Sequence, residues 1–340
     1  PPQRRWPTAF SKSIGACSRS PRRSRQAGRA LSADRESAGR PLAAFFGALL
    51  FLALLSLTLS YVAVPIRWLE LVGLGVAAVF VGLPIAAVFA VGIWSWSPSK
   101  AVLFIVVGAL AHAGPPVLAH LTGGAGTAPA MFALSQIGLI TWTTGLGALL
   151  ATLLRDKNLL IPVSLFLAAF DIFLVLTPMG FTRQIIEQAP ETLAKVGWAI
   201  PAASSAPTVG PVTPMAHIGP ADFVFAAMFS VALVRFDLRH RATMIWLVPA
   251  LIAYLGIVYF VGPLPALVPI GVCVLAVNAP EFKLSAQEWL GTALVVLIAG
   301  LLIGWSVWRG RPSGPSSGAP NPAGSGSAGS PEPAIPNPPP

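Results

Sequence analysis

Charged side chains are scarce in this sequence. Lys, Arg, Asp and Glu together make up 10% of the 340 residues, whereas about a quarter of the residues in ordinary soluble domains are charged. Hydrophobic residues make up 55%. This balance excludes a soluble globular protein and indicates an integral membrane protein embedded in the lipid bilayer.

Cysteine and histidine are also too few, or too scattered, to build a metal site. Cys17 lies in a polar segment and Cys273 in an apolar run, so neither a disulfide framework nor a thiolate cluster is predicted. No HExxH or comparable spacing occurs among the four histidines, which are His112, His120, His217 and His240. We therefore expect no metal and no other cofactor.

Long apolar runs, in contrast, are abundant. Most have the roughly 20 residues that a helix needs to cross about 30 Å of hydrocarbon. Only helices and closed barrels satisfy their backbone groups in lipid, so the runs predict an all-α membrane protein with about nine transmembrane helices. They cover residues 42–64, 69–94, 101–121, 132–154, 159–178, 221–236, 242–261, 264–279 and 289–308.

Two of these runs are short. Residues 221–236 and 264–279 both have Pro or Gly at their entrances. Irregular backbone at membrane depth is tolerated where it lines a cavity rather than facing lipid. We therefore expect short or broken helices around a functional site in this part of the chain.

The two ends of the chain differ from its apolar middle, 42–308. Residues 1–41 hold ten Lys or Arg against two acids, Asp34 and Glu36, which predicts a disordered basic tail. Residues 309–340 are rich in Pro, Gly and Ser and predict a second disordered tail. The arginines of the basic tail lack interleaved aromatics, so we interpret them as a topology signal and expect no nucleic-acid binding.

The distribution of basic residues predicts the orientation of the chain. With nine crossings and the N-terminus inside, the inside segments hold 17 Lys or Arg, ten of them in the tail, and the outside segments hold five. Basic residues concentrate on the cytoplasmic side of membrane proteins. The count therefore favours a cytoplasmic N-terminus and places the 179–220 connection outside.

Two aspartates lie inside apolar runs, Asp171 in the stretch AAFDIFLVLTP and Asp222 in GPADFVF. A charged side chain at the centre of a bilayer costs about 3 kcal/mol or more, so such residues are rare unless function requires them. The residues three and four positions away are apolar, so neither aspartate finds a cation along its own helix. Because their runs are neighbours in sequence, we expect the two side chains to meet across a helix–helix interface.

Two carboxyl groups at close range in a low-dielectric site cannot both ionise, and they share one proton. The charged member can then activate a water as general base while the protonated member donates to a carbonyl oxygen. This is the chemistry of aspartic proteases, so the pair predicts peptide hydrolysis inside the membrane. A capping role is possible for Asp222 at the start of its helix but is not expected for Asp171 in the middle of a run.

Three motifs resemble those of a known family. The stretch FDIFLVLTPMGFTRQIIEQAP, from Phe170 to Pro190, resembles the first catalytic motif of presenilins. GPAD, ending at Asp222, resembles the family's GxGD motif, and PALVP, beginning at Pro265, resembles its PAL motif. In this order the motifs cover about residues 170–270, and the chain resembles a prokaryotic member of the presenilin and signal peptide peptidase superfamily.

The resemblance implies an intramembrane aspartyl protease of the plasma membrane with a presenilin-like bundle. Proteases of this family cleave transmembrane peptides or proteins, and the resemblance implies that Asp171 and Asp222 are the catalytic dyad here. The resemblance also implies that the following residues shape the active site and seat an unwound substrate: Phe170, Gly219, Pro220, Ala221, Pro265, Ala266 and Leu267. From the residues themselves, glycine in GPAD suits a close backbone approach, proline in PAL breaks a helix, and an exposed strand edge would hold substrate.

The sequence departs from the family pattern in three places. Ala221 replaces the second glycine of GxGD, which adds a methyl group and restricts positive φ. Phe170 stands where the family has tyrosine, so a phenol hydroxyl is missing beside the first aspartate. Four apolar runs precede that aspartate instead of five, and the extra run 289–308 follows the PAL-containing one.

The 179–220 connection and the function both leave alternatives open. Residues 181–198 predict an interfacial amphipathic helix, and 199–216 have the composition of a loop. The resemblance suggests that this segment is a gate or an autocleavage region, and the alternative is a plain linker. As to maturation, we favour the plain linker. A proton-coupled transporter and a catalytically silent scaffold that binds transmembrane helices are the alternatives to a protease.

Overall fold

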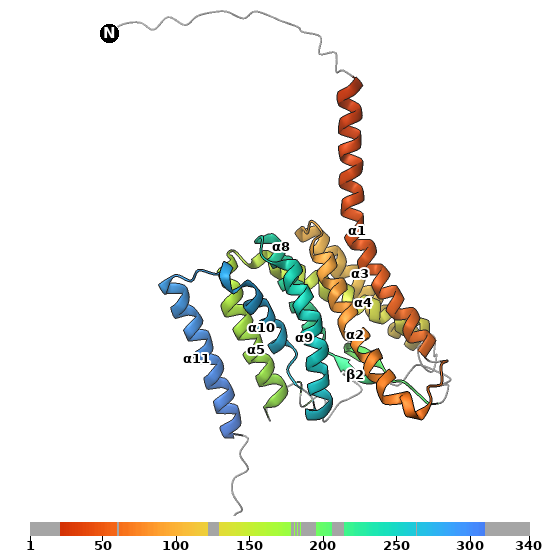
Figure 1. Ribbon diagram of the computed structural model, residues 1–340, viewed down its shortest axis with the longest axis vertical. Coiled ribbons are helices and arrows are strands. Elements are labelled where there is room, and N and C mark those ends of the chain that lie inside the picture. The colour runs from red at the N-terminus through yellow and green to blue at the C-terminus, as the bar shows by residue number, and fades with distance from the viewer. Residues whose placement is uncertain are drawn as a thin grey trace, which may run out of the picture.

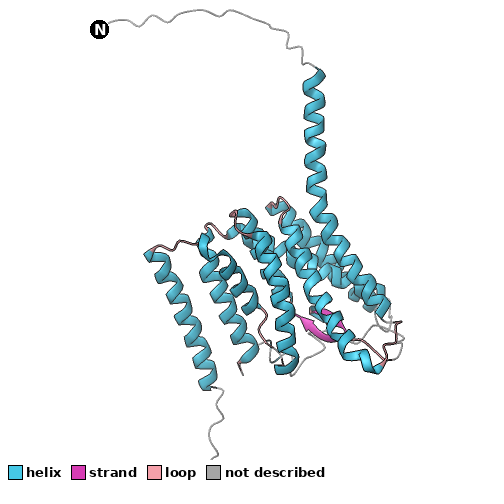
Figure 2. Ribbon diagram, viewed as in Figure 1, coloured by secondary structure: helices cyan, strands magenta, loops and turns pink. Residues whose placement is uncertain are grey.

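The computed structural model describes residues 21–59, 61–121, 129–177, 180, 182, 184, 195–205, 214–262 and 264–309. Figures 1 and 2 show that these residues form a bundle of helices with one small pair of strands. The described part of the chain contains nine α-helices and no larger sheet. The prediction of an all-α, multi-pass membrane protein is confirmed at this level.

Seven of the described helices are long and apolar enough to cross a membrane. The other two, α8 (Pro220–Arg235) and α10 (Leu267–Asn278), have 16 and 12 residues. They coincide with the two runs expected to be short, so about nine crossings stays a prediction. The seven long helices are α1 (Pro21–Leu59), α2 (Leu69–Gly92), α3 (Pro98–Leu121), α4 (Pro129–Leu153), α5 (Leu160–Leu176), α9 (His240–Val261) and α11 (Ala286–Arg309).

Helix α1 begins well before the first apolar run. It starts at Pro21, so half of the segment expected to be a disordered tail is helical. Arg, Gln, Ala and Glu are good helix formers, and the apolar span that follows supplies the nucleus from which the helix extends. In Figure 1 this first part of α1 projects away from the bundle. Residues 1–20 and 310–340 lie outside the described residues.

The centre of the bundle is α8, which packs against α4 and α2. Nearly every side chain of α8 from Phe223 to Leu233 is buried. Close approach to α4 depends on Gly147, because a Cβ at that position would overlap the backbone of Val224. Small residues at helix contacts are the usual means by which membrane helices pack closely.

A second group of helices surrounds α5. Both α10 and α11 pack against α5, α10 also packs against α9, and α9 packs against α2. Figure 1 shows α11 at the edge of the bundle, followed by α5, α10 and α9. The two predicted catalytic aspartates therefore lie on helices whose main packing partners differ.

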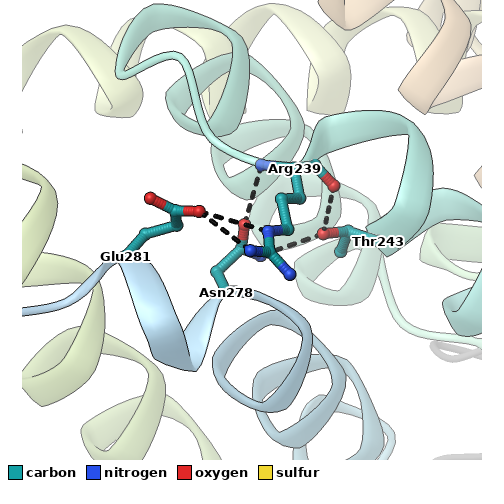
Figure 3. A network of polar contacts seen from close by, with 4 residues as sticks. All are labelled: Arg239, Thr243, Asn278 and Glu281. Atoms are coloured by element: carbon teal, nitrogen blue, oxygen red, sulfur yellow. Dashed lines mark hydrogen bonds and ion pairs between the residues drawn. The ribbon is translucent and has the colours of Figure 1, made fainter.

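Polar contacts tie several connections together at one end of the bundle (Figure 3). The buried Asn278 accepts a hydrogen bond from the backbone N–H of Arg239 (2.8 Å) and donates to Thr243 Oγ1 (3.0 Å). Arg239 also forms an ion pair with Glu281 (3.1 Å). This network joins the α8–α9 connection to the end of α10.

A second set of polar contacts extends this end of the bundle to α4, α5 and α11. Asn158, just before α5, donates to the carbonyl oxygen of Lys283 (3.0 Å) and to Glu288 Oε1 in the first turn of α11 (3.1 Å). Arg235, at the end of α8, donates to the carbonyl oxygen of Ala151 near the end of α4 (2.7 Å). The helix ends opposite the predicted active site are therefore held by hydrogen bonds as well as by packing.

The strands correct the prediction for the 179–220 connection. β1 (Trp198–Pro201) and β2 (Pro214–Ile218) pair antiparallel, where a helix end and a loop were expected. Trp198 and Ile200 are both buried, so the strand is stabilised by burial against helices rather than by length. Most of the predicted amphipathic helix lies outside the described residues.

Candidate active site

Asp171 lies five residues before the end of α5, and its carboxylate reaches the beginning of another helix. Its Oδ2 accepts a hydrogen bond from the backbone N–H of Leu267, the first residue of α10, at 2.8 Å. The first N–H groups of a helix have no partner inside that helix, and the helix dipole favours negative charge there. Asp171 therefore caps α10. Asp171 lies inside α5 and does not cap its own helix, as expected, but its hydrogen bond to the start of α10 was not foreseen.

The segment between α9 and α10 has the open backbone that the PAL motif predicted. α9 ends at Val261, Gly262 has φ = 100°, and α10 begins only at Leu267. Pro265 and Leu267 are buried and Ala266 is half-buried. The carbonyl oxygen of Pro265 accepts a hydrogen bond from the Tyr254 hydroxyl at 3.0 Å. Backbone groups on both sides of Ala266 are thus used by side chains from neighbouring helices.

Asp222 lies in the first turn of α8, directly after β2. Pro220 is the first residue of the helix, a position that tolerates proline because its missing N–H has no helical partner. The backbone N–H of Asp222 donates to the carbonyl oxygen of Gly219 (3.2 Å). The next residue, Phe223, is fully buried and packs edge-to-face against Trp198. The strand pair and the helix start therefore fix one another.

The structure brings the two aspartates near one another. Asp171 lies within electrostatic range of Asp222, although 51 residues separate them in the sequence. One side chain comes from near the end of α5 and the other from the beginning of α8. That the two side chains meet across a helix–helix interface is the central structural expectation from the sequence, and it stays a prediction.

The surroundings of three of the predicted shaping residues can be described. Phe170 is 43% exposed and stacks on Phe166, so its ring faces outward. Ala221 is exposed inside the first turn of α8 and has no positive φ. Gly219 has φ = −66°, and a Cβ there would lie 3.5 Å from Asp222 Oδ2, an ordinary contact distance. Among the described residues, nothing crowds the Ala221 methyl group, and nothing approaches Gly219 so closely that an alanine there would clash.

Gln136 is a site residue that the motifs did not reveal. This buried amide accepts a hydrogen bond from the backbone N–H of Ala199 (2.9 Å) and donates to the carbonyl oxygen of Gly197 (3.3 Å). It occupies one edge of β1 as a neighbouring strand would. The indole of Trp198 adds a hydrogen bond to the carbonyl oxygen of Phe80 (2.9 Å). A lone amide in an apolar run was the available signal, since polar groups in membrane helices find partners.

Tyr254 is the second such residue, and its signal was weaker. It is one of three tyrosines in the chain and lies in the apolar run before the PAL motif. A tyrosine in such a run is compatible with simple burial, so only the fold reveals that its hydroxyl reaches Pro265.

Within the described residues, no three His, Cys, Asp or Glu side chains lie together as a metal site would require.

Comparisons with protein-family models, curated proteins and solved structures found no match. The functional argument therefore rests on the residues of the site: two carboxyl groups, an open backbone segment between helices, a phenol and a strand pair.

Proposed function

We propose that the protein is an intramembrane aspartyl protease that hydrolyses peptide bonds within transmembrane segments. The observation that carries the proposal is the hydrogen bond from the Leu267 N–H to the carboxylate of Asp171, which lies within electrostatic range of Asp222. Each residue also occupies the position of a presenilin-type motif. Acidic side chains inside a helical membrane bundle mark functional sites by default.

In the proposed reaction the carboxyl pair holds one proton. The charged aspartate takes a proton from a water, whose oxygen attacks the carbonyl carbon of the substrate, while the protonated aspartate donates to the carbonyl oxygen. Collapse of the tetrahedral intermediate breaks the C–N bond, and a proton passes to the leaving amine. The hydrogen bond from Leu267 N–H holds one oxygen of Asp171 in place for these steps.

The strand pair supports the expected mode of substrate binding. A helical substrate must unwind before its peptide bond becomes accessible, and an unwound segment can add to a strand edge. One edge of β1 is already bound by Gln136. β2 ends at Ile218, four residues before Asp222. A substrate strand added along β2 would therefore run toward the dyad.

The proposal is tested with purified protein in detergent micelles or bicelles and a synthetic transmembrane peptide. The parent protein should cut the peptide, and Asp171→Asn and Asp222→Asn should each lose cleavage by a factor of about 10³ or more, because neither amide can serve as acid or base. Asp237→Asn is the matched control. This exposed aspartate lies at the end of the bundle opposite the predicted active site, and its φ of 55° suits asparagine.

Retention of full cleavage by both site variants would contradict the proposal. Cleavage by neither parent nor variants, together with tight peptide binding, would favour the silent scaffold. Proton uptake by liposomes that contain the parent protein, lost in both variants, would favour the transporter.

A further inference from the structure

The PAL segment, residues 264–267, is held from two sides, by an acceptor on α5 and by a donor on α9. On one side the Leu267 N–H donates to Asp171 on α5, and on the other the Pro265 carbonyl oxygen accepts from Tyr254 on α9. The two bonds lie two residues apart on one stretch of backbone. Any shift of Pro265 therefore moves the amide that orients the Asp171 carboxylate.

The bond from Tyr254 meets a need that the fold creates. Because α9 has ended and α10 has not begun, the Pro265 carbonyl lies outside both helices. A backbone carbonyl without a partner at membrane depth costs several kcal/mol, so it must be satisfied locally. A tyrosine hydroxyl inside the bundle likewise needs a partner. The phenol and the carbonyl satisfy one another.

Position 170 has no phenol, and its ring stacks on Phe166. The tyrosine expected beside the first motif aspartate is a phenylalanine here, and its ring faces outward. Tyr254, in contrast, lies within electrostatic range of Asp171. The phenol of this region is thus supplied by α9 rather than by α5.

We infer that Tyr254 is a positioning residue for the carboxyl pair. By holding the Pro265 carbonyl it fixes the Leu267 amide, and through that amide it fixes the orientation of Asp171. The catalytic consequence rests on the proposed function, whereas the positioning itself does not.

Two variants on the same helix test the inference. Tyr254→Phe keeps the ring and removes only the hydroxyl. Tyr259→Phe removes a hydroxyl from a side chain that is 62% exposed five residues later, and it is the matched control. Amide hydrogen exchange of residues 264–268 is measured by mass spectrometry on the full chain in detergent. Loss of one hydrogen bond should speed exchange there about fivefold to tenfold in Tyr254→Phe and leave Tyr259→Phe unchanged.

Kinetics with the transmembrane peptide give the second measurement. Tyr254→Phe should lower kcat about fivefold to tenfold with KM unchanged within a factor of two, since the dyad and not the substrate is displaced. Adding Phe170→Tyr to this variant should not restore kcat, because position 170 faces outward. Restored activity in the double variant would overturn the inference.

The two hypotheses fail in different ways. Unchanged exchange in Tyr254→Phe, with cleavage by the parent protein, overturns the positioning role and leaves the protease standing. Faster exchange in Tyr254→Phe, with no cleavage by the parent, upholds the positioning role and removes the protease.

Discussion

At the scale of single residues, the capping of α10 by Asp171 shows how the bundle accommodates a carboxylate in an apolar helix. The N-terminus of a helix offers unpaired N–H groups and a favourable dipole. The Leu267 amide is such a group, and it comes from 96 residues further along the chain. Sequence patterns could therefore single out Asp171 as a candidate, but could not identify its hydrogen-bond donor, because capping rules describe neighbours in sequence.

The alanine in GPAD gives the first prediction. Ala221 lies exposed in a helical turn, so Ala221→Gly should lower the free energy of unfolding by about 0.5–1 kcal/mol, as glycine does in helices. Cleavage should not increase. Thermal unfolding in detergent and the peptide assay check these outcomes. Greater stability or faster cleavage in the glycine variant would show that the motif glycine is needed here after all.

Gly219 supplies the companion prediction. A Cβ at this position meets Asp222 Oδ2 at an ordinary contact distance, and the backbone φ suits any residue. Gly219→Ala should therefore change the unfolding temperature by less than about 2 °C, within the range of substitutions that introduce no strain. A large loss of stability would mean that the start of α8 is more crowded than the structure shows.

At the scale of elements, helices were predictable and the strand pair was not. The apolar runs coincide with the helices because backbone N–H and C=O groups in lipid must be hydrogen-bonded within the protein, and a helix does this within one segment. β1 and β2 are four and five residues long and contain proline, which is depleted from strands. Their pairing depends on Gln136 and on burial of Trp198, both of which need the surrounding helices in place.

The role of Gln136 predicts the effect of removing it. Gln136→Leu leaves the Ala199 N–H and the Gly197 carbonyl without partners, which should destabilise the strand pair by about 1–3 kcal/mol. Faster amide exchange in residues 197–201 would report this. Thr152→Val on the same helix is the control, because its hydroxyl bonds the helix's own backbone at Leu149. Equal exchange in both variants would contradict the role of Gln136.

His217 makes β2 sensitive to pH. Burial lowers the pKa of His217 below its ordinary value of about 6.5, and its Nε2 has no hydrogen-bond partner among the residues that the structure describes. The unfolded state therefore binds the proton more readily, so the strand pair should lose stability as pH falls below about 6.5 and gain nothing above it. Exchange of the β2 amides, corrected for intrinsic rates, should rise between pH 7.5 and 5.5.

Replacement of the histidine provides the check on this pH effect. In His217→Gln the rise should disappear, because glutamine does not titrate. The same rise in parent and variant would assign the effect to another group.

At the scale of the whole molecule, the polar contacts of Asn158, Asn278 and Arg235 gather the α4–α5, α8–α9 and α10–α11 connections at one end. The dyad, the PAL segment and the strand pair lie toward the other ends of these helices. The order of the helices was predicted from apolar runs alone. The grouping of their ends was not, because side-chain contacts between distant connections leave no periodic signal in a sequence.

The positive-inside distribution predicts the side on which each end lies. Cysteines placed at exposed positions 156 and 287, in a chain with Cys17 and Cys273 replaced by alanine, should react with impermeant reagents only from the cytoplasm. Cysteines at exposed positions 62 and 215 should react only from the opposite side. The reverse pattern would invert the orientation, and labelling of all four positions from one side would contradict alternating crossings.

Helix α11 restricts the direction from which the proposed dyad can be approached. Helix α11 packs along α5 at the edge of the bundle. The flank of α5 that it covers is therefore closed to lipid. Another flank bears the stacked rings of Phe166 and Phe170, both more than 40% exposed. Under the proposed function, a substrate helix diffusing in the bilayer would enter past these two rings, and replacing both with alanine would widen this entrance.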